Sequence, residues 1–313
     1  MSLLFDAVLA LLVLGLGWRV VATPAPVPAA IAFIAYGLAL ALAWVRLAAV
    51  DVALTEAAVG GGITGMVLLR AAGQSPAAPA RPPAGLRVVA ALLSAAVAVA
   101  LAAIVLALPE PAPTLAPLAA EHMPATGLGN PVTGVLLVFR ALDTLLETVV
   151  LLVGLLAVWA LSKDRGWQGA PPPLWADAPH PAQDLIARVL APLGVVVAIY
   201  MFWAGADVPG GAFQGGAVLA AMWLLLMTAG LARPPLAGGR WLRAGLLAGP
   251  FGFLFVGATG WATAGVFLGY PAGWEKPVIV AVEVAITLSI GITLALMVLE
   301  PPADPAADGR GAP

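Results

Sequence analysis

The sequence predicts an all-α integral membrane protein that crosses the bilayer about nine times. Hydrophobic residues make up 62% of its 313 residues and charged residues only 10%, whereas about 25% of the residues in a soluble domain are charged. Apolar stretches long enough to span a bilayer as helices recur along the whole chain. They predict transmembrane helices at residues 2–22, 27–48, 51–71, 86–108, 130–161, 184–204, 212–232, 243–267 and 276–299.

The basic residues predict the orientation of these helices. If the N-terminus lies outside, 11 of the 14 lysines and arginines fall on the cytoplasmic side, two fall outside, and Arg140 falls within the membrane. This asymmetry is typical of the positive-inside rule. We therefore expect an outside N-terminus and a cytoplasmic C-terminus.

Two proline-rich segments, 73–85 and 162–183, divide the chain. We predict domains at 1–72, 86–165 and 180–300, with three, two and four transmembrane helices. The polar tail at 301–313 is expected to be disordered.

The composition excludes several kinds of site. The chain has no cysteine, so a disulfide, an iron–sulfur cluster or a cysteine-bound zinc ion is impossible. Its two histidines, His122 and His180, lie in different loops, and no phosphate-binding glycine loop is present. We expect no catalytic residue, bound metal, cofactor or nucleic-acid partner.

Three charged residues lie in the predicted helix 130–161. Arg140, Asp143 and Glu147 are spaced by three and four residues, so they share one face of a continuous helix, with Glu147 close to the bilayer midplane. Charges at that depth are costly unless they face protein, water or one another. They predict either a proton or cation relay centred on Glu147 or a structural ion pair that only fixes helix packing.

The predicted helix 51–71 combines acidic residues with glycines. Glu56 lies one turn before Gly60, and Asp51 lies at the start of the helix. Glycines permit a close approach of another helix and weaken the helix itself, which favours a bulge or local unwinding. Glu56 is therefore either a carboxylate beside a flexible helix segment or a side chain that reaches the interface.

Residues 207–216 cannot form a plain helix. Pro209, Gly210, Gly211, Gln214, Gly215 and Gly216 lie in this segment, and irregular backbone near a membrane must be buried in protein or line water. The alternatives are a tight turn capped by Asp207 and a binding role. Glu283, in the predicted helix 276–299, is a weaker candidate. Glycine pairs at 61/65, 211/215 and 245/249 predict close contacts with helices of other membrane proteins in an assembly.

Three of these segments are similar to signatures of one family of membrane complexes. Residues 51–60, DVALTEAAVG, resemble the small C-terminal domain of the large A subunit of Mrp-type cation/proton antiporters, which is a separate D subunit in membrane-bound hydrogenases. Residues 130–150, with a phenylalanine, an arginine, Asp-Thr and a glutamate, resemble the next domain, the E subunit of the hydrogenases. Residues 209–216 resemble the Mrp B subunit, although Ala212 stands where glycine is usual.

The resemblance implies a fusion of the C-terminal domains of the Mrp A subunit with the B subunit, equivalent to the D, E and F subunits of the hydrogenases. It implies a transporter subunit rather than an enzyme, with Na⁺ and H⁺ as transported ions and with Glu56, Asp143 and Glu147 on their route. The expected partners are other membrane subunits and the lipid bilayer of a bacterial inner membrane. The alternatives are a subunit of a hydrogenase or related redox-driven pump, a structural scaffold, and a self-sufficient transporter.

Overall fold

A computed structural model describes residues 2–74, 82–161, 170–171 and 181–299 of the chain, and all regular structure in these residues is helical. Among the described residues, eight helices are long and apolar enough to cross a membrane, and Ala212–Thr228 is a further, shorter apolar helix where the sequence predicts a ninth crossing. The predicted fold class is confirmed. The predicted domain bounds stay predictions. The tail at 301–313 and most of both linkers lie outside the described residues.

Apart from the span predicted at 130–161, the long helices agree with the predicted ones to within a few residues. They are α1 (Ser2–Ala22), α2 (Pro26–Arg46), α3 (Val50–Thr55) continued by α4 (Gly65–Gly73), α5 (Ala84–Ala107), α8 (Ala141–Ala160), α9 (Pro181–Ala204), α10 (Ala212–Thr228), α11 (Arg240–Thr263) and α12 (Glu275–Val298). The connection between the helices predicted at 86–108 and 130–161 contains a short helix, α6 (Ala116–His122), followed by a 3₁₀ turn at Met123–Thr126.

A π-helix at Glu56–Thr64 joins α3 to α4. The predicted weakening by glycine is confirmed, because Gly60, Gly61 and Gly62 all lie within it. Gly60 has a further role: the Glu56 carboxyl group folds over it and occupies the position that a Cβ atom would take. Glu56 therefore lies against its own helix and is half-buried.

The predicted continuous helix 130–161 is wrong. The segment forms α7 (Pro131–Gly134), a π-helix at Val135–Phe139, and α8, which begins after Arg140. Arg140 has φ −130° and ψ 35°, outside the helical region, so the helix is interrupted there. Arg140 therefore does not share a continuous helix face with Asp143 and Glu147.

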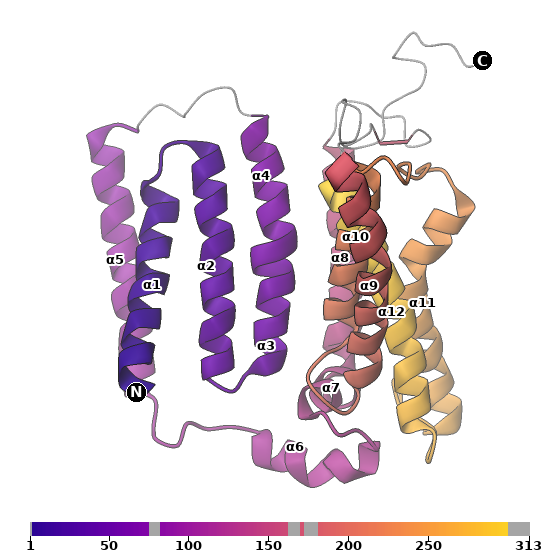
Figure 1. Cartoon of the computed structure of the whole chain (residues 1–313). Helices are drawn as coiled ribbons and strands as arrows, with labels where there is room; N and C mark the ends of the chain where they lie inside the picture. Colours follow the sequence, from indigo (N-terminus) through magenta and orange to yellow (C-terminus); the bar gives the residue numbers. More distant parts are fainter. Residues whose placement is uncertain (1, 75–81, 162–169, 172–180, 300–313) are drawn as a thin grey trace, which may run out of the picture.

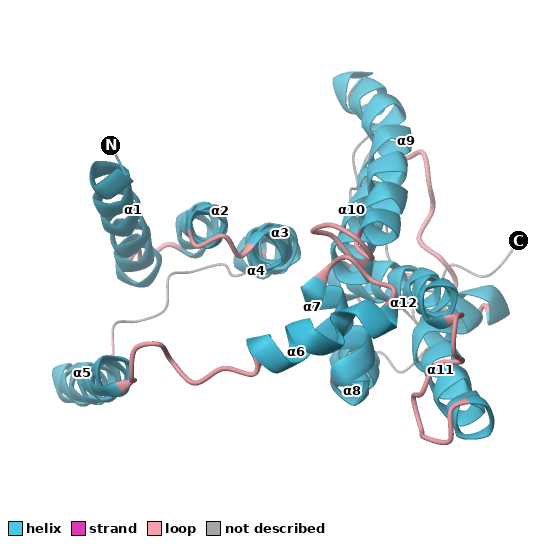
Figure 2. Ribbon diagram, turned by 90° about the horizontal axis from the view of Figure 1, so that it is seen from below, coloured by secondary structure: helices cyan, strands magenta, loops and turns pink. Residues whose placement is uncertain are grey.

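The helices form two groups, which meet where α3, the π-helix at 56–64 and α4 contact α10 and α12; Figure 1 shows the two groups side by side. Helices α1 to α4 lie in a row, α5 stands apart from them, and α7 to α12 form the second group, with α6 running across one end (Figure 2). In the second group α12 packs against α10, α11 and α8 and is the most buried of the eight long spans. No residue of α5 is buried.

The glycine pairs pack inside the chain, contrary to the prediction that they contact other membrane proteins. A Cβ atom on Gly37 of α2 would lie 2.8 Å from the Gly61 backbone nitrogen, so α2 and the π-helix touch backbone to backbone. Gly215 lies against α9 and α12, and Gly249 lies against Ser289 of α12. The large apolar side chains that remain exposed lie on several helices, among them α1, α5, α9 and α11.

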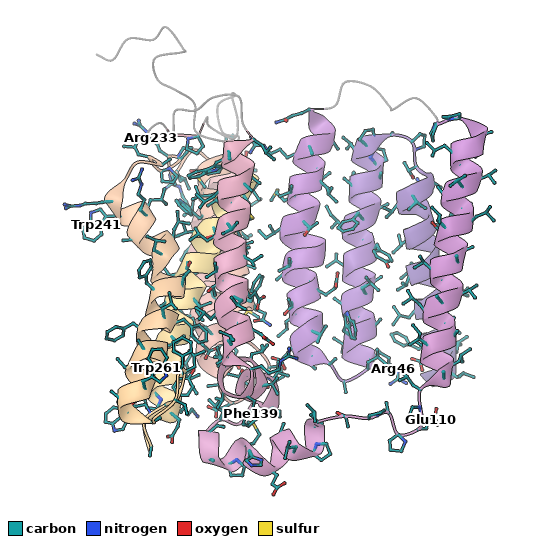
Figure 3. The ribbon with its side chains drawn as sticks, turned by 180° about the vertical axis from the view of Figure 1, so that it is seen from behind. Arg46, Glu110, Phe139, Arg233, Trp241 and Trp261 are labelled. Atoms are coloured by element: carbon teal, nitrogen blue, oxygen red, sulfur yellow. The ribbon has the colours of Figure 1, made fainter. Side chains whose placement is uncertain are left out.

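The two ends of the bundle carry the residues that the orientation prediction places on opposite sides of the membrane. Figure 3 shows Arg46 and Glu110 near one end and Arg233 at the other. At the Arg233 end, Arg70 Nη1 of α4 donates to the Val298 carbonyl oxygen of α12 over 2.8 Å. Which end faces the cytoplasm remains a prediction, based on the positive-inside rule.

Cysteine labelling tests this orientation directly, because the natural chain contains no cysteine. In intact cells, Ala112→Cys, exposed in the loop before α6, should react with a membrane-impermeant maleimide. Leu236→Cys, exposed in the α10–α11 connection, should react only after the membrane is permeabilised. If both cysteines react in intact cells, the number of membrane crossings between them is even. If Leu236→Cys reacts in intact cells and Ala112→Cys reacts only after permeabilisation, the orientation is the reverse of the predicted one.

Candidate functional site

Asp51 joins the three predicted domains through one carboxylate oxygen. Its Oδ1 accepts hydrogen bonds from Asn130 Nδ2 over 3.2 Å and from the Gly210 backbone N–H over 3.0 Å. Asn130 Nδ2 also donates to the Val208 carbonyl oxygen, and Gln214 Nε2 donates to Thr55 Oγ1 over 2.9 Å. Asp51 is buried, so both of its hydrogen bonds are shielded from competition with water. It therefore fixes the start of α3 against both other parts of the chain.

The glycines of residues 209–216 explain how α10 enters this junction. Gly210 has φ +159°, and a Cβ atom on it would lie 2.5 Å from the Met201 carbonyl oxygen. Gly216 lies so close to α12 that a Cβ atom would meet Ile290 at 2.7 Å. The segment is thus a tight turn followed by a closely packed helix. One alternative predicted that Asp207 caps α10. The structure contradicts it, because Asp207 instead forms an ion pair with Lys276 at 2.6 Å.

Side chains satisfy the carbonyl groups that the π-helix at Val135–Phe139 leaves without regular helical partners. Tyr270 donates its hydroxyl to the Leu137 carbonyl oxygen over 2.6 Å, and Thr144 Oγ1 donates to the Leu136 carbonyl oxygen over 2.6 Å. Burial raises the pKa of the Tyr270 phenol, and the carboxyl group of Glu283 raises it further. Tyr270 therefore remains a neutral hydrogen-bond donor at physiological pH.

A cavity of about 350 Å³ lies between these elements. Residues of α3, α7, α8, α10 and α12 line it. Its polar lining consists of oxygen-bearing side chains and no lysine or arginine: Asp51, Thr55, Thr133, Thr144, Glu147, Thr148, Gln214 and Glu283. The cavity opens beside Val52, Val132 and Glu147, which are exposed. Such a lining suits a small cation, a proton or water.

Glu147 and Glu283 occupy different depths of this cavity. Glu147 is exposed at its rim, six residues into α8, or about 9 Å along the helix. The break at Arg140 places it nearer the outer end than the predicted midplane position. Glu283 is only 2% exposed and lies eight residues into α12, about 12 Å along the helix.

The Arg140–Asp143 ion pair lies outside the cavity. The two side chains form a salt bridge at the start of α8, and they are 70% and 52% exposed. Neither they nor Glu56 line the cavity. Of the residues predicted for the ion pathway, only Glu147 lines the cavity, together with the weaker candidates Asp51 and Glu283, whereas Arg140, Asp143 and Glu56 lie apart from it.

The sequence did not reveal that Thr133, Thr144 and Tyr270 belong to this site. Thr133 Oγ1 donates to the Gly205 carbonyl oxygen over 2.6 Å, which ties α7 to the end of α9. The Thr133 and Tyr270 contacts join residues more than 70 positions apart, and a single sequence carries no signal for them. The sequence marks Glu283 only weakly, because its helix offers no obvious charged partner; its burial, which the structure shows, distinguishes it.

Comparison with known proteins agrees with this architecture. Residues 10–77 match the MbhD family, described as the D subunit of MBH, and residues 183–300 match a domain related to the MnhB subunit of the Na⁺/H⁺ antiporter. The structure of the Mrp complex from Dietzia sp. DQ12-45-1b contains a chain that is similar over 98% of this chain, with 26% identity and a TM-score of 0.75. The chain is an Mrp-type A–B fusion.

The Mrp-type chain spans only 35% of the matched chain of the Dietzia complex. A second solved structure, the membrane-bound sulfane sulfur reductase, an archaeal respiratory membrane complex, shares the fold. There the match covers 68% of this chain and 96% of the other, with 24% identity and a TM-score of 0.55. None of the curated proteins matches the Mrp-type chain.

Proposed function

We propose that the chain is a membrane subunit of an Mrp-type monovalent cation/proton antiporter, in which it contributes to the ion route and to assembly. The observation that carries this proposal is the cavity lined by Glu147 of α8, Glu283 of α12 and other oxygen-bearing side chains, with no basic residue. Intramembrane carboxylates of this kind mark ion and proton pathways. Na⁺ and H⁺ are the ions that the similarity to the antiporter domain suggests.

Exposed charge and apolar surface support a role within a larger assembly. Glu147 lies at membrane depth yet is exposed in the isolated chain, and an acid facing lipid there would be costly. No residue of α5 is buried by the rest of the described chain, so the apolar side chains of this helix remain exposed. Other membrane subunits would cover both surfaces. A bacterial inner membrane is the proposed location, and we propose no catalytic activity for the chain itself.

The second candidate is a subunit of a redox-driven ion pump. Two observations favour it: the match of residues 10–77 to a domain of MBH, and the shared fold with the archaeal respiratory complex. The same cavity would then conduct ions in a machine driven by electron transfer. The antiporter is preferred because the domain at 183–300 and the longer of the two structural matches both point to it.

Co-purification separates these two candidates. A tagged chain, extracted from its native membrane in mild detergent, should bring with it other polytopic membrane subunits and no cysteine-rich redox protein. Cysteine-rich iron–sulfur proteins in the purified assembly would favour the redox pump. A stable, monodisperse chain without any partner would contradict both and would favour a self-sufficient transporter.

A further inference from the structure

Glu283 presents an oxygen atom that nothing in the described chain satisfies. The residue is 2% exposed, and its Oε2 has no hydrogen-bond partner among the described residues, while the Ala212 backbone amide bonds to its carboxyl group. A buried carboxylate oxygen without a partner is costly. A proton or a cation bound in the cavity would remove that cost.

A second oxygen lies next to this carboxyl group. A Cβ atom on Gly211 would lie 3.1 Å from Gln214 Oε1 and 3.9 Å from Glu283 Oε1, so the two oxygens flank the same glycine. The Gln214 amide nitrogen is engaged with Thr55, which turns the amide oxygen away from that bond. Gly211 thus keeps open a space between one carboxylate and one amide oxygen, the ligand types that hard cations prefer.

The charges around this space suit a singly charged ion. The titratable groups that face Glu283 are Asp51 on α3, Glu147 on α8 and Tyr270 before α12. Lys276, at the start of α12, is paired with Asp207. In the described residues, no three His, Asp or Glu side chains gather closely enough to hold a metal ion, which disfavours a divalent site.

We propose that Glu283 is the inner ligand of a site for one small monovalent cation, and that it carries a proton when the cation is absent. Gln214 Oε1 supplies a second ligand, and Glu147 at the rim is the group through which the ion or proton enters. Cation and proton compete for one carboxylate, so each leaves as the other binds. This inference rests on the proposed function, because it assigns the exchanged ions to a place in the same cavity.

Carbodiimide labelling of the intact complex tests the site. Dicyclohexylcarbodiimide enters apolar regions and adds to a protonated carboxylic acid, so peptide mass spectrometry should find the label on Glu283 in choline chloride. Na⁺ should protect it, reducing labelling about tenfold when its concentration is about ten times its Kd. Labelling of Glu283 should fall as the pH rises, because only the protonated acid reacts. Na⁺ favours the ionised form of Glu283, so this fall should occur at lower pH in NaCl than in choline chloride.

Matched variants complete the experiment. Glu275→Gln, on the same helix but outside the cavity, should leave both the labelling of Glu283 and its protection unchanged, whereas Glu147→Gln should keep the labelling and weaken the protection. Equal labelling in NaCl and choline chloride, or no labelling of Glu283 in an intact complex, would overturn the site. If the complex exchanges Na⁺ for H⁺ but Na⁺ does not protect Glu283 from labelling, only this inference is refuted. If Na⁺ protects Glu283 but the complex does not exchange ions, only the proposed function is refuted.

Discussion

Replacing Asp51 with alanine should separate the parts of the chain that its carboxylate holds together. The Gly210 backbone N–H loses its acceptor in a buried position, and the Asn130 side-chain amide loses one of its two acceptors and keeps the Val208 carbonyl oxygen. A buried donor left without a partner costs about 1–3 kcal/mol, and the bond lost by Asn130 adds to that cost. We expect a marked fall in the melting temperature of the detergent-purified complex and in the yield of assembled protein.

Asparagine at the same position is the matched control. Both donors bond to Oδ1 of Asp51, and Asp51→Asn keeps one such oxygen, so it should cost clearly less than Asp51→Ala. In the Asp51→Ala background, Asn130→Ala should cost less than it does in the natural chain, because the bond to Asp51 is already lost and only the bonds with Val208 and Val132 remain to be broken. Equal damage from asparagine and alanine would show that charge rather than hydrogen bonding holds the junction. An alanine variant as stable as the natural chain would refute the junction.

The sequence predicted the helices well because hydrophobic length alone decides which segments can cross a membrane. It also predicted the weak point of the third span, since three consecutive glycines lie in the π-helix at 56–64. The second π-helix, at 135–139, has no such signal: its residues Val-Leu-Leu-Val-Phe read as ordinary apolar helix. Tyr270 and Thr144, which stabilise it, are recognised only once the chain has folded.

The site was predicted in its parts and not in its arrangement. The acidic residues and the glycine segment 209–216 were identified because charge and glycine are unusual in apolar helices. The sequence did not predict which of these residues lie together in the fold, because the break at Arg140 moves the Arg140–Asp143 pair to the outer end of α8. The carboxylate that meets Glu147 in the cavity comes instead from Glu283, 136 positions along the chain.

Glu147→Gln should abolish ion exchange while leaving the complex assembled. Glu147 lies at the open rim of the cavity, and glutamine keeps its size and much of its hydrogen bonding but cannot bind or release a proton. The exposed rim position means that no contact within the chain is lost. Glu121→Gln, on the exposed helix α6 and outside the cavity, is the matched control and should behave as the natural chain does.

The most direct measurement is Na⁺-driven proton movement in everted membrane vesicles that contain the complete set of subunits, followed by a pH-sensitive dye. Vesicles with the natural chain or Glu121→Gln should respond to NaCl and not to choline chloride. Vesicles with Glu147→Gln, compared at equal amounts of assembled complex, should respond no more than vesicles that lack this chain. A full response from Glu147→Gln would contradict the ion route and leave a structural scaffold as the better account.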